Sequence, residues 1–99
     1  MSSGVRKRMV GTFTGTGASL DIKVVGFRPG SVELFNETDV TEAEWLSSMG
    51  DGSAKKEITA GDKTFITTQG VTPLANGFNV GTDGVCNGSG DKIHFVAEE

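Results

Sequence analysis

Short runs of alternating apolar and polar residues, separated by glycine or proline, set the strongest limit on how this chain can fold. In the run that begins at Ala18, the apolar residues Leu20, Ile22 and Val24 alternate with polar ones. A period of two places alternate side chains on opposite faces of a β-strand, so this run is expected to bury one face. Comparable runs recur about every ten residues, which is typical of an all-β, mainly antiparallel domain.

The expected architecture is a small β-sandwich or partly open barrel of about seven or eight short strands. Leu20–Phe27 and Ser31–Asn36 flank a Pro29-Gly30 turn signal and are therefore predicted to form a hairpin. Lys92–Ala97 is predicted to be the last strand, and as an uncapped edge strand it could add to a neighbouring sheet. The 15 glycines among 99 residues agree with many tight turns.

One segment breaks the period-two pattern and is predicted to be a short helix over Thr41–Met49. Its first residue and Glu44 fit a capping box, and Gly50 stands where a glycine commonly ends a helix. Glu42 and Glu44 would then lie at the helix start, where carboxylates interact favourably with the helix dipole. Trp45, the only tryptophan, is expected to plug one end of the sheet core, because large aromatic side chains are usually well buried.

Basic residues cluster at the start of a chain that is acidic elsewhere. Arg6, Lys7 and Arg8 supply three of its nine cations, and the net charge is −4. Residues 1–9 are therefore expected to form a flexible basic N-terminal arm, and residues 10–99 a single β-domain. The arm could contact phosphate or an acidic protein surface, or it could be a solvated terminus. The acidic body argues against nucleic-acid binding, and no apolar run is long enough to span a membrane.

The two residues best suited to nucleophilic chemistry lack the partners that catalysis requires. His94, the only histidine, is expected on a strand face with Lys92 and Val96, exposed or within an interface. Cys86 is the only cysteine, and no orienting group stands beside it and His94, so a Cys–His pair is not predicted. A lone cysteine without a secretion signal indicates synthesis in a reducing cytoplasm.

The glycine-rich segment 82–91 contains oxygen ligands but lacks the spacing of a known binding motif. Asp83, Asn87 and Asp91 do not fit the EF-hand pattern, and residues 70–90 contain no phosphate-binding glycine motif. Asn and Asp beside Gly are also typical of tight turns, because they tolerate positive φ. The segment is interpreted as a loop, and no catalytic residue, metal or cofactor is predicted.

The order of several short motifs along the chain adds a second line of inference. They are GFRPGSVEL at Gly26–Leu34, EWLSSMGDGSA at Glu44–Ala54, TTQGVTPL at Thr67–Leu74, GFNVGTD at Gly77–Asp83 and IHFVA at Ile93–Ala97. This succession falls within residues 20–97, most of the chain, and resembles small virion structural proteins of tailed bacteriophages. The resemblance implies a capsid decoration (cement) protein, a small β-domain that clamps adjacent subunits of the major capsid protein.

Such a protein would be made in the host cytoplasm and would lie on the capsid exterior of the virion, without enzymatic activity. Its expected partners are the major capsid protein and copies of itself, as a homotrimer on the capsid. The basic arm could lie over an acidic capsid surface, and the last strand could contact a neighbour. The candidate partner-binding residues are therefore Arg6, Lys7, Arg8, Lys92, His94 and Val96.

The alternative is a tail-associated or exposed virion module that binds host-surface glycan. Glycan sites usually present an exposed tryptophan or tyrosine as a stacking platform. This chain has no tyrosine, so the alternative depends on Trp45 being exposed in a groove.

Overall fold

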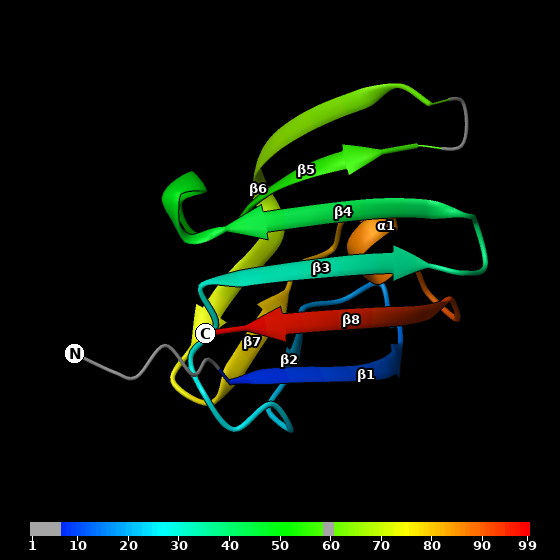
Figure 1. The fold of residues 1–99 in the computed structure, drawn as a ribbon. Coiled ribbons are helices and arrows are strands. Elements are labelled where there is room, and N and C mark those ends of the chain that lie inside the picture. Colours follow the sequence, from blue (N-terminus) through cyan, green and yellow to red (C-terminus); the bar gives the residue numbers. More distant parts are fainter. Residues whose placement is uncertain (1–6, 59–60) are drawn as a thin grey trace.

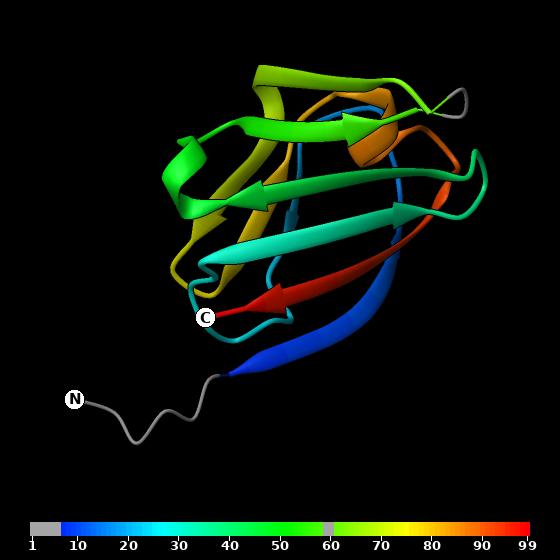
Figure 2. The same ribbon diagram turned by 45° about the horizontal axis from the view of Figure 1, so that its top comes forward.

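The computed structural model describes residues 7–58 and 61–99 of the chain. In this part, eight strands form one antiparallel sheet that curls into a half-barrel (Figures 1 and 2). The elements are β1 (Arg8–Thr14), β2 (Leu20–Ile22), β3 (Ser31–Asn36), β4 (Thr41–Leu46), the 3₁₀ turn η1 (Ser47–Met49), β5 (Ser53–Glu57), β6 (Lys63–Leu74), β7 (Gly77–Val80), the helical turn α1 (Gly84–Asn87) and β8 (Lys92–Glu98). The all-β, antiparallel fold class is confirmed, and of the two architectures expected, the sheet is the partly open barrel.

The strand order differs from the order that the sequence suggested. It runs β1-β8-β3-β4-β5-β6-β7-β2, so the last strand of the chain lies between β1 and β3 (Figure 1). The prediction that Lys92–Ala97 is an edge strand is wrong, because β8 is hydrogen-bonded on both sides. The predicted hairpin of Leu20–Phe27 with Ser31–Asn36 is also wrong, since β2 pairs with β7 and β3 pairs with β4 and β8.

The core fills the inner side of the curled sheet. Alternate residues of β3 and β8 point into it, and Val32 and Ile93 are fully buried. Phe95 packs edge-on against Phe78, with ring centroids 5.3 Å apart. Trp45 is 1% exposed, and its Nε1 donates a hydrogen bond to the Gly50 carbonyl at 2.8 Å. The prediction that Trp45 belongs to the core is therefore confirmed.

The helix predicted over Thr41–Met49 is wrong for its first six residues, which form β4. Thr41, Ala43 and Trp45 are buried in alternation, as a strand requires. β4 is held on one side by β3 and on the other by β5, and this pairing overrides the helical capping pattern. Only the turn η1 at Ser47–Met49 is helical in this segment.

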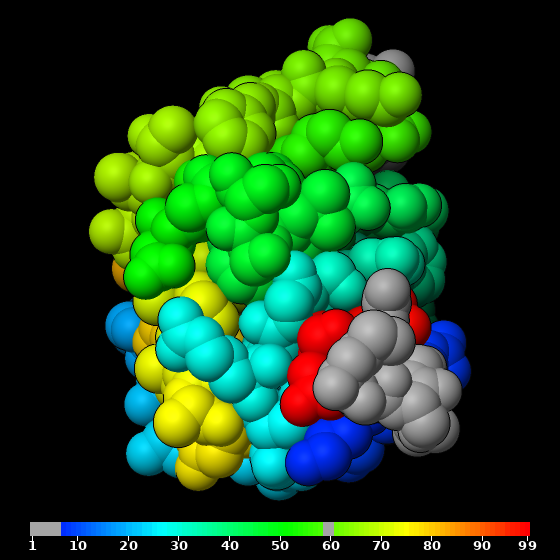
Figure 3. All heavy atoms as spheres, turned by 60° about the vertical axis from the view of Figure 1, so that its left-hand side comes forward, coloured from blue at the N-terminus to red at the C-terminus, as the bar shows by residue number. Residues whose placement is uncertain are grey.

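β6 passes from one side of the half-barrel to the other through a bend at Gln69. The first half of β6 pairs with β5 and the second half with β7. Gln69 has a φ of 64°, and a Cβ on Gly70 would lie 2.5 Å from the Ser53 carbonyl oxygen. The β5–β6 hairpin therefore turns away from the rest of the sheet and projects from the body (Figures 1 and 3).

β1 begins at Arg8, so Arg8 and Met9, which the sequence placed in a flexible arm, are part of the sheet. The Lys7 carbonyl accepts a hydrogen bond from the Glu99 amide at 3.0 Å, which places the start of β1 beside the end of β8. Arg6 and the rest of the predicted arm lie outside the described residues. No helix among the described residues has the length and apolarity needed to cross a membrane.

Val40, in the loop that joins β3 to β4, has a backbone conformation that β-branched residues rarely adopt. Its φ is 55°, in the left-handed region, and its side chain is 65% exposed, so little packing offsets the strain. Val40→Asn is expected to raise the free energy of unfolding by about 1 kcal/mol, because asparagine tolerates this region. Urea titration measures the change, and Val40→Ala should gain less. An unchanged or lower value for Val40→Asn would contradict the strain.

Candidate protein-binding face

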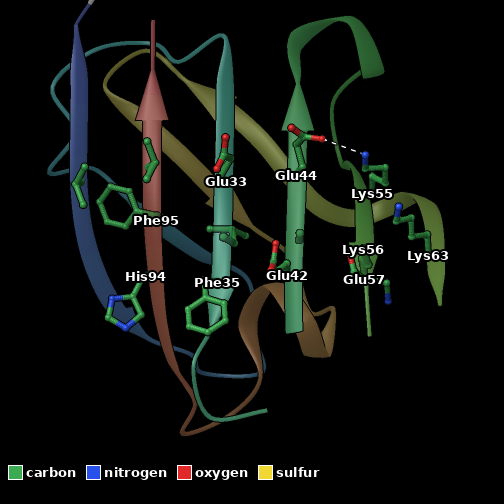
Figure 4. A pocket seen from close by; sticks show the side chains of 14 residues that line it. Glu33, Phe35, Glu42, Glu44, Lys55, Lys56, Glu57, Lys63, His94 and Phe95 are labelled. Atoms are coloured by element: carbon green, nitrogen blue, oxygen red, sulfur yellow. Dashed lines mark ion pairs between the residues drawn. The ribbon is translucent and has the colours of Figure 1, made fainter. Parts of the chain in front are cut away.

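Alternate side chains of five neighbouring strands, β1, β8, β3, β4 and β5, point away from the core and form an outer face on the sheet (Figure 4). A shallow groove of about 350 Å³ lies on this face. It is lined by Val10, Glu33, Leu34, Phe35, Glu42, Ala43, Glu44, Lys55, Lys56, Glu57, Lys63, His94, Phe95 and Val96. We call this set the outer groove.

The strand register places glutamates directly opposite one another in the outer groove. Glu33 on β3 is the cross-strand partner of Glu44 on β4, and Glu42 on β4 is the partner of Glu57 on β5. Figure 4 shows these carboxylates side by side across neighbouring strands. Like charges directly opposite each other destabilise a sheet, so this arrangement costs folding free energy.

Nearby cations neutralise only part of this negative charge. Lys55 Nζ lies 3.4 Å from Glu44 Oε1, but both side chains are about half exposed, so the pair contributes little. Lys56 turns toward the interior instead and binds Asp83, with Nζ 2.6 Å from Oδ2. Among the described residues, Glu33, Glu42 and Glu57 have no cation within 4.0 Å. Lys63 on β6 is the cross-strand partner of Glu57, so the four glutamates of the outer groove stand against Lys55 and Lys63, and the groove keeps a net negative charge.

Exposed apolar side chains stand beside these carboxylates. Val10 on β1 is 56% exposed, Phe35 on β3 is 39% exposed, and Phe65 on β6 is 55% exposed. Phe65 is the cross-strand partner of Lys55, which places it at the far side of the same face. Exposed aromatic side chains are typical of protein-binding surfaces, whereas a site for a small ligand would be more enclosed.

His94 is held in a defined position at one end of the outer groove. Its Nε2 lies 2.6 Å from Glu37 Oε1, and its ring stacks on Phe35 with centroids 6.0 Å apart. The hydrogen bond from His94 and the charge of Lys92 lower the pKa of Glu37. The side chain of His94 is 38% exposed, as the sequence predicted, but its partner Glu37 was not foreseen.

Cys86 is unsuited to nucleophilic chemistry. It is fully buried in α1, and burial, with the nearby charge of Asp83, raises the pKa of its thiol to about 12. The thiol therefore stays protonated at neutral pH, where only the thiolate would react. Asp83, interpreted from the sequence as a turn residue, caps α1, because its Oδ1 accepts from the Val85 amide at 2.9 Å.

A second pair of carboxylates, Asp39 and Asp91, lies outside the outer groove. The negative charge of Asp91 raises the pKa of Asp39, and Asn36 Nδ2 donates to Asp91 Oδ2 at 2.9 Å. Within residues 7–58 and 61–99, no group of three or more His, Cys, Asp or Glu side chains could hold a metal ion.

The candidate residues from the sequence are distributed over several places. His94 and Val96 line the outer groove, whereas Lys92 lies beyond it, and Arg8 Nε is 3.9 Å from Glu98 Oε2 at the start of β1. Lys7 is exposed, and Arg6 is outside the described residues. The structure adds residues that the sequence did not single out, namely Glu33, Phe35, Glu42, Glu44, Lys55, Glu57 and Phe65.

Comparison with protein-family models, with curated proteins and with solved structures finds no match for this chain. The resemblance to phage virion proteins therefore depends on the order of the sequence motifs.

Proposed function

We propose that this protein is a non-enzymatic structural protein of a tailed-phage virion, a capsid decoration protein that binds the major capsid protein through its outer groove. The observation that carries the proposal is the two pairs of facing glutamates, Glu33 with Glu44 and Glu42 with Glu57. A partner that brings lysine or arginine side chains to this face replaces repulsion by attraction. The partner surface is therefore basic at its centre, with apolar side chains around it.

Two features of the chain support a binding role over a catalytic one. The only cysteine is buried with a raised pKa, and among the described residues no thiol or hydroxyl group is hydrogen-bonded to the only histidine. The outer groove is lined by residues of the strands β1, β8, β3, β4, β5 and β6, a breadth that suits a protein partner. The order of motifs along the sequence points to the virion as the place where this partner is found.

The glycan-binding alternative has lost its main support. Trp45 was the expected stacking platform, but it is 1% exposed and lies in the core. Its ring nitrogen is also satisfied by the Gly50 carbonyl, so no polar group of Trp45 is left for a sugar.

The test is to mix the purified protein with expanded, undecorated capsids and to count bound copies across a range of salt concentrations. Wild-type protein is expected to bind at a fixed number of copies per capsid, more weakly as salt rises. Glu42→Gln with Glu57→Gln is expected to weaken binding at least about tenfold, because it removes two unpaired charges from the groove. The same double variant is expected to raise the free energy of unfolding by about 0.2–1 kcal/mol, since it relieves a repulsive cross-strand pair.

The control is Asp51→Asn with Glu99→Gln, which removes the same two charges from exposed residues outside the groove. This control should bind capsids as the wild type does. A wild-type protein that leaves capsids undecorated would overturn the proposed function. Equal binding by the Glu42 and Glu57 variant and its control would place the contact elsewhere on the molecule.

A further inference from the structure

The curled sheet has two edges, and they differ in how well they are protected against pairing with another chain. β2 has three residues, and the side chain of its Asp21 accepts a hydrogen bond from Asn79 Nδ2 at 2.8 Å. β1 has seven residues, and it contains neither charge nor proline from Met9 to Thr14. Edge strands of natural proteins are usually kept short or interrupted by charge, proline or a bulge. β1 has none of these protections over its central residues.

The backbone groups on the free side of β1 belong to Arg8, Val10, Thr12 and Thr14. On the other side, the Lys7 carbonyl accepts from the Glu99 amide and the Gly15 amide donates to the Asp91 carbonyl, at 3.0 and 2.8 Å. Ladder bonds alternate along an antiparallel strand, so the odd-numbered residues of β1 bond to β8 and the even-numbered ones face outward. Among the described strands, none pairs with this outward side, which forms the lower border of the sheet in Figure 2.

We propose that β1 pairs antiparallel with β1 of a second copy of this chain, about a two-fold axis at Gly11. In this register the outward backbone groups of Val10 face those of Thr12 of the second copy, and those of Arg8 face Thr14. Each such pair exchanges two hydrogen bonds. The inference does not depend on the proposed function, because it rests on the free backbone groups of β1, of which only those of Val10 belong to a residue of the outer groove.

The side chains favour this occupant because the strand is complementary to itself in this register. On the inner face, Met9 meets Phe13 of the second copy, and both are partly buried against the core already. On the outer face, the 56% exposed Val10 meets Thr12, a pair of β-branched residues. The only charged residue of the paired strands that meets the partner is Arg8, and it faces an uncharged threonine.

Gly11, at the proposed two-fold axis, has no side chain that would stand against its copy on the second strand. A Cβ on Gly11 would lie 2.8 Å from the ring of Phe95, so this ring covers the backbone where a side chain would otherwise stand. Antiparallel pairing of one strand with its own copy uses the same patch twice and closes after two copies. The assembly is therefore a dimer, in contrast to the homotrimer expected from the sequence, and its outer faces join into one continuous surface across Val10.

The experiment measures the oligomeric state by analytical ultracentrifugation over a wide concentration range. Val10→Pro removes an outward N–H and places a ring at the interface, while the bonds from β1 to β8 stay intact. It is expected to raise the dimer dissociation constant at least about tenfold, and Val10→Ala, which keeps the N–H, should change it far less. Circular dichroism and the unfolding midpoint verify that each variant is folded.

A pair of charge variants tests the register itself. Val10→Lys with Thr12→Lys sets like charges against each other across the axis, whereas Val10→Lys with Thr12→Glu sets opposite charges there. The first variant is expected to be monomeric and the second to dimerise. A wild-type protein that is monomeric at all concentrations overturns the inference. An oligomer that Val10→Pro leaves unchanged, a trimer, or equal behaviour of the two charge variants overturns it as well.

Discussion

Replacing Asp83 with alanine is expected to lower the free energy of unfolding by about 3–5 kcal/mol, among the largest effects of any single change in this chain. The Asp83 side chain is 12% exposed and that of its partner Lys56 is 16% exposed. Alanine leaves the ammonium group of Lys56 in a largely dry position without its counter-ion. It also removes the side chain that accepts the Val85 amide at the start of α1, which contributes about 1 kcal/mol in other helices.

A double-mutant cycle separates these two roles of Asp83. Asp83→Asn keeps an oxygen for the Val85 amide but loses the charge, so it should cost less than Asp83→Ala. Combining Asp83→Asn with Lys56→Met replaces the pair by neutral side chains and is expected to recover most of the lost stability. Chemical denaturation of the wild type, Asp83→Asn, Lys56→Met and the double variant gives the coupling free energy. A loss of only about 1 kcal/mol in Asp83→Ala would show that the ion pair contributes nothing beyond the cap.

The second large effect is expected at Asn87, which is fully buried. Its side chain links α1 by hydrogen bonds to the segment before β2 and to the residue after β7. Its Oδ1 accepts from the Thr16 amide at 2.8 Å, and its Nδ2 donates to the carbonyls of Ala18 and Gly81 at 2.6 and 2.8 Å. Asn87→Ala leaves all three backbone groups without this partner. The Gly81 bond is buried and the other two are partly buried, so the expected loss is about 3 kcal/mol, since each unsatisfied buried group costs about 1–3 kcal/mol.

Asn79 provides a control of the same chemical type. Its Nδ2 donates to Ser19 Oγ and Asp21 Oδ1, both at 2.8 Å, but these bonds are exposed to water. Asn79→Ala is therefore expected to cost less than about 1 kcal/mol, since water can replace the lost partners. Amide exchange should also show faster exchange at Thr16 in Asn87→Ala and not in Asn79→Ala. Equal losses in the two variants would contradict the role given to Asn87.

The strands were the most predictable part of this fold, because period-two burial is a property of each segment alone. Ser31–Asn36 shows this, since Val32 and Leu34 are buried as its alternation indicates. Thr41–Leu46 was harder, because its apolar residues fit both a helical and a strand spacing over so short a length. Pairing with β3 on one side and β5 on the other makes this segment a strand, and these partners cannot be inferred from the sequence of the segment alone.

The candidate site could not be predicted for the same reason, because it depends on which strands pair. Glu42 and Glu44 were assigned to a helix start, where carboxylates are ordinary and favourable. In the structure they lie on a strand, where the register places Glu44 opposite Glu33 and Glu42 opposite Glu57, so that like charges face each other. Cross-strand facing of like charges depends on how strands pair, and the pairing of β3, β4 and β5 cannot be obtained from any one of their sequences. His94 and Val96, by contrast, could be placed on the outer face from alternation within β8.

The place of β8 between β1 and β3 has a consequence for how the protein is made. β1 and β3 are both synthesised long before β8, yet each pairs with it in the finished sheet. Until β8 has left the ribosome, β1 lacks its only partner among the described strands, and β3 has one unpaired side. Long-range pairing of this kind folds slowly and leaves strands open to association with other chains. A nascent chain that is stalled before β8 should therefore be protease-sensitive over β1. On polysomes, the free edge of β1, which is uncharged from Met9 to Thr14, is the segment most exposed to co-translational pairing with a neighbouring copy.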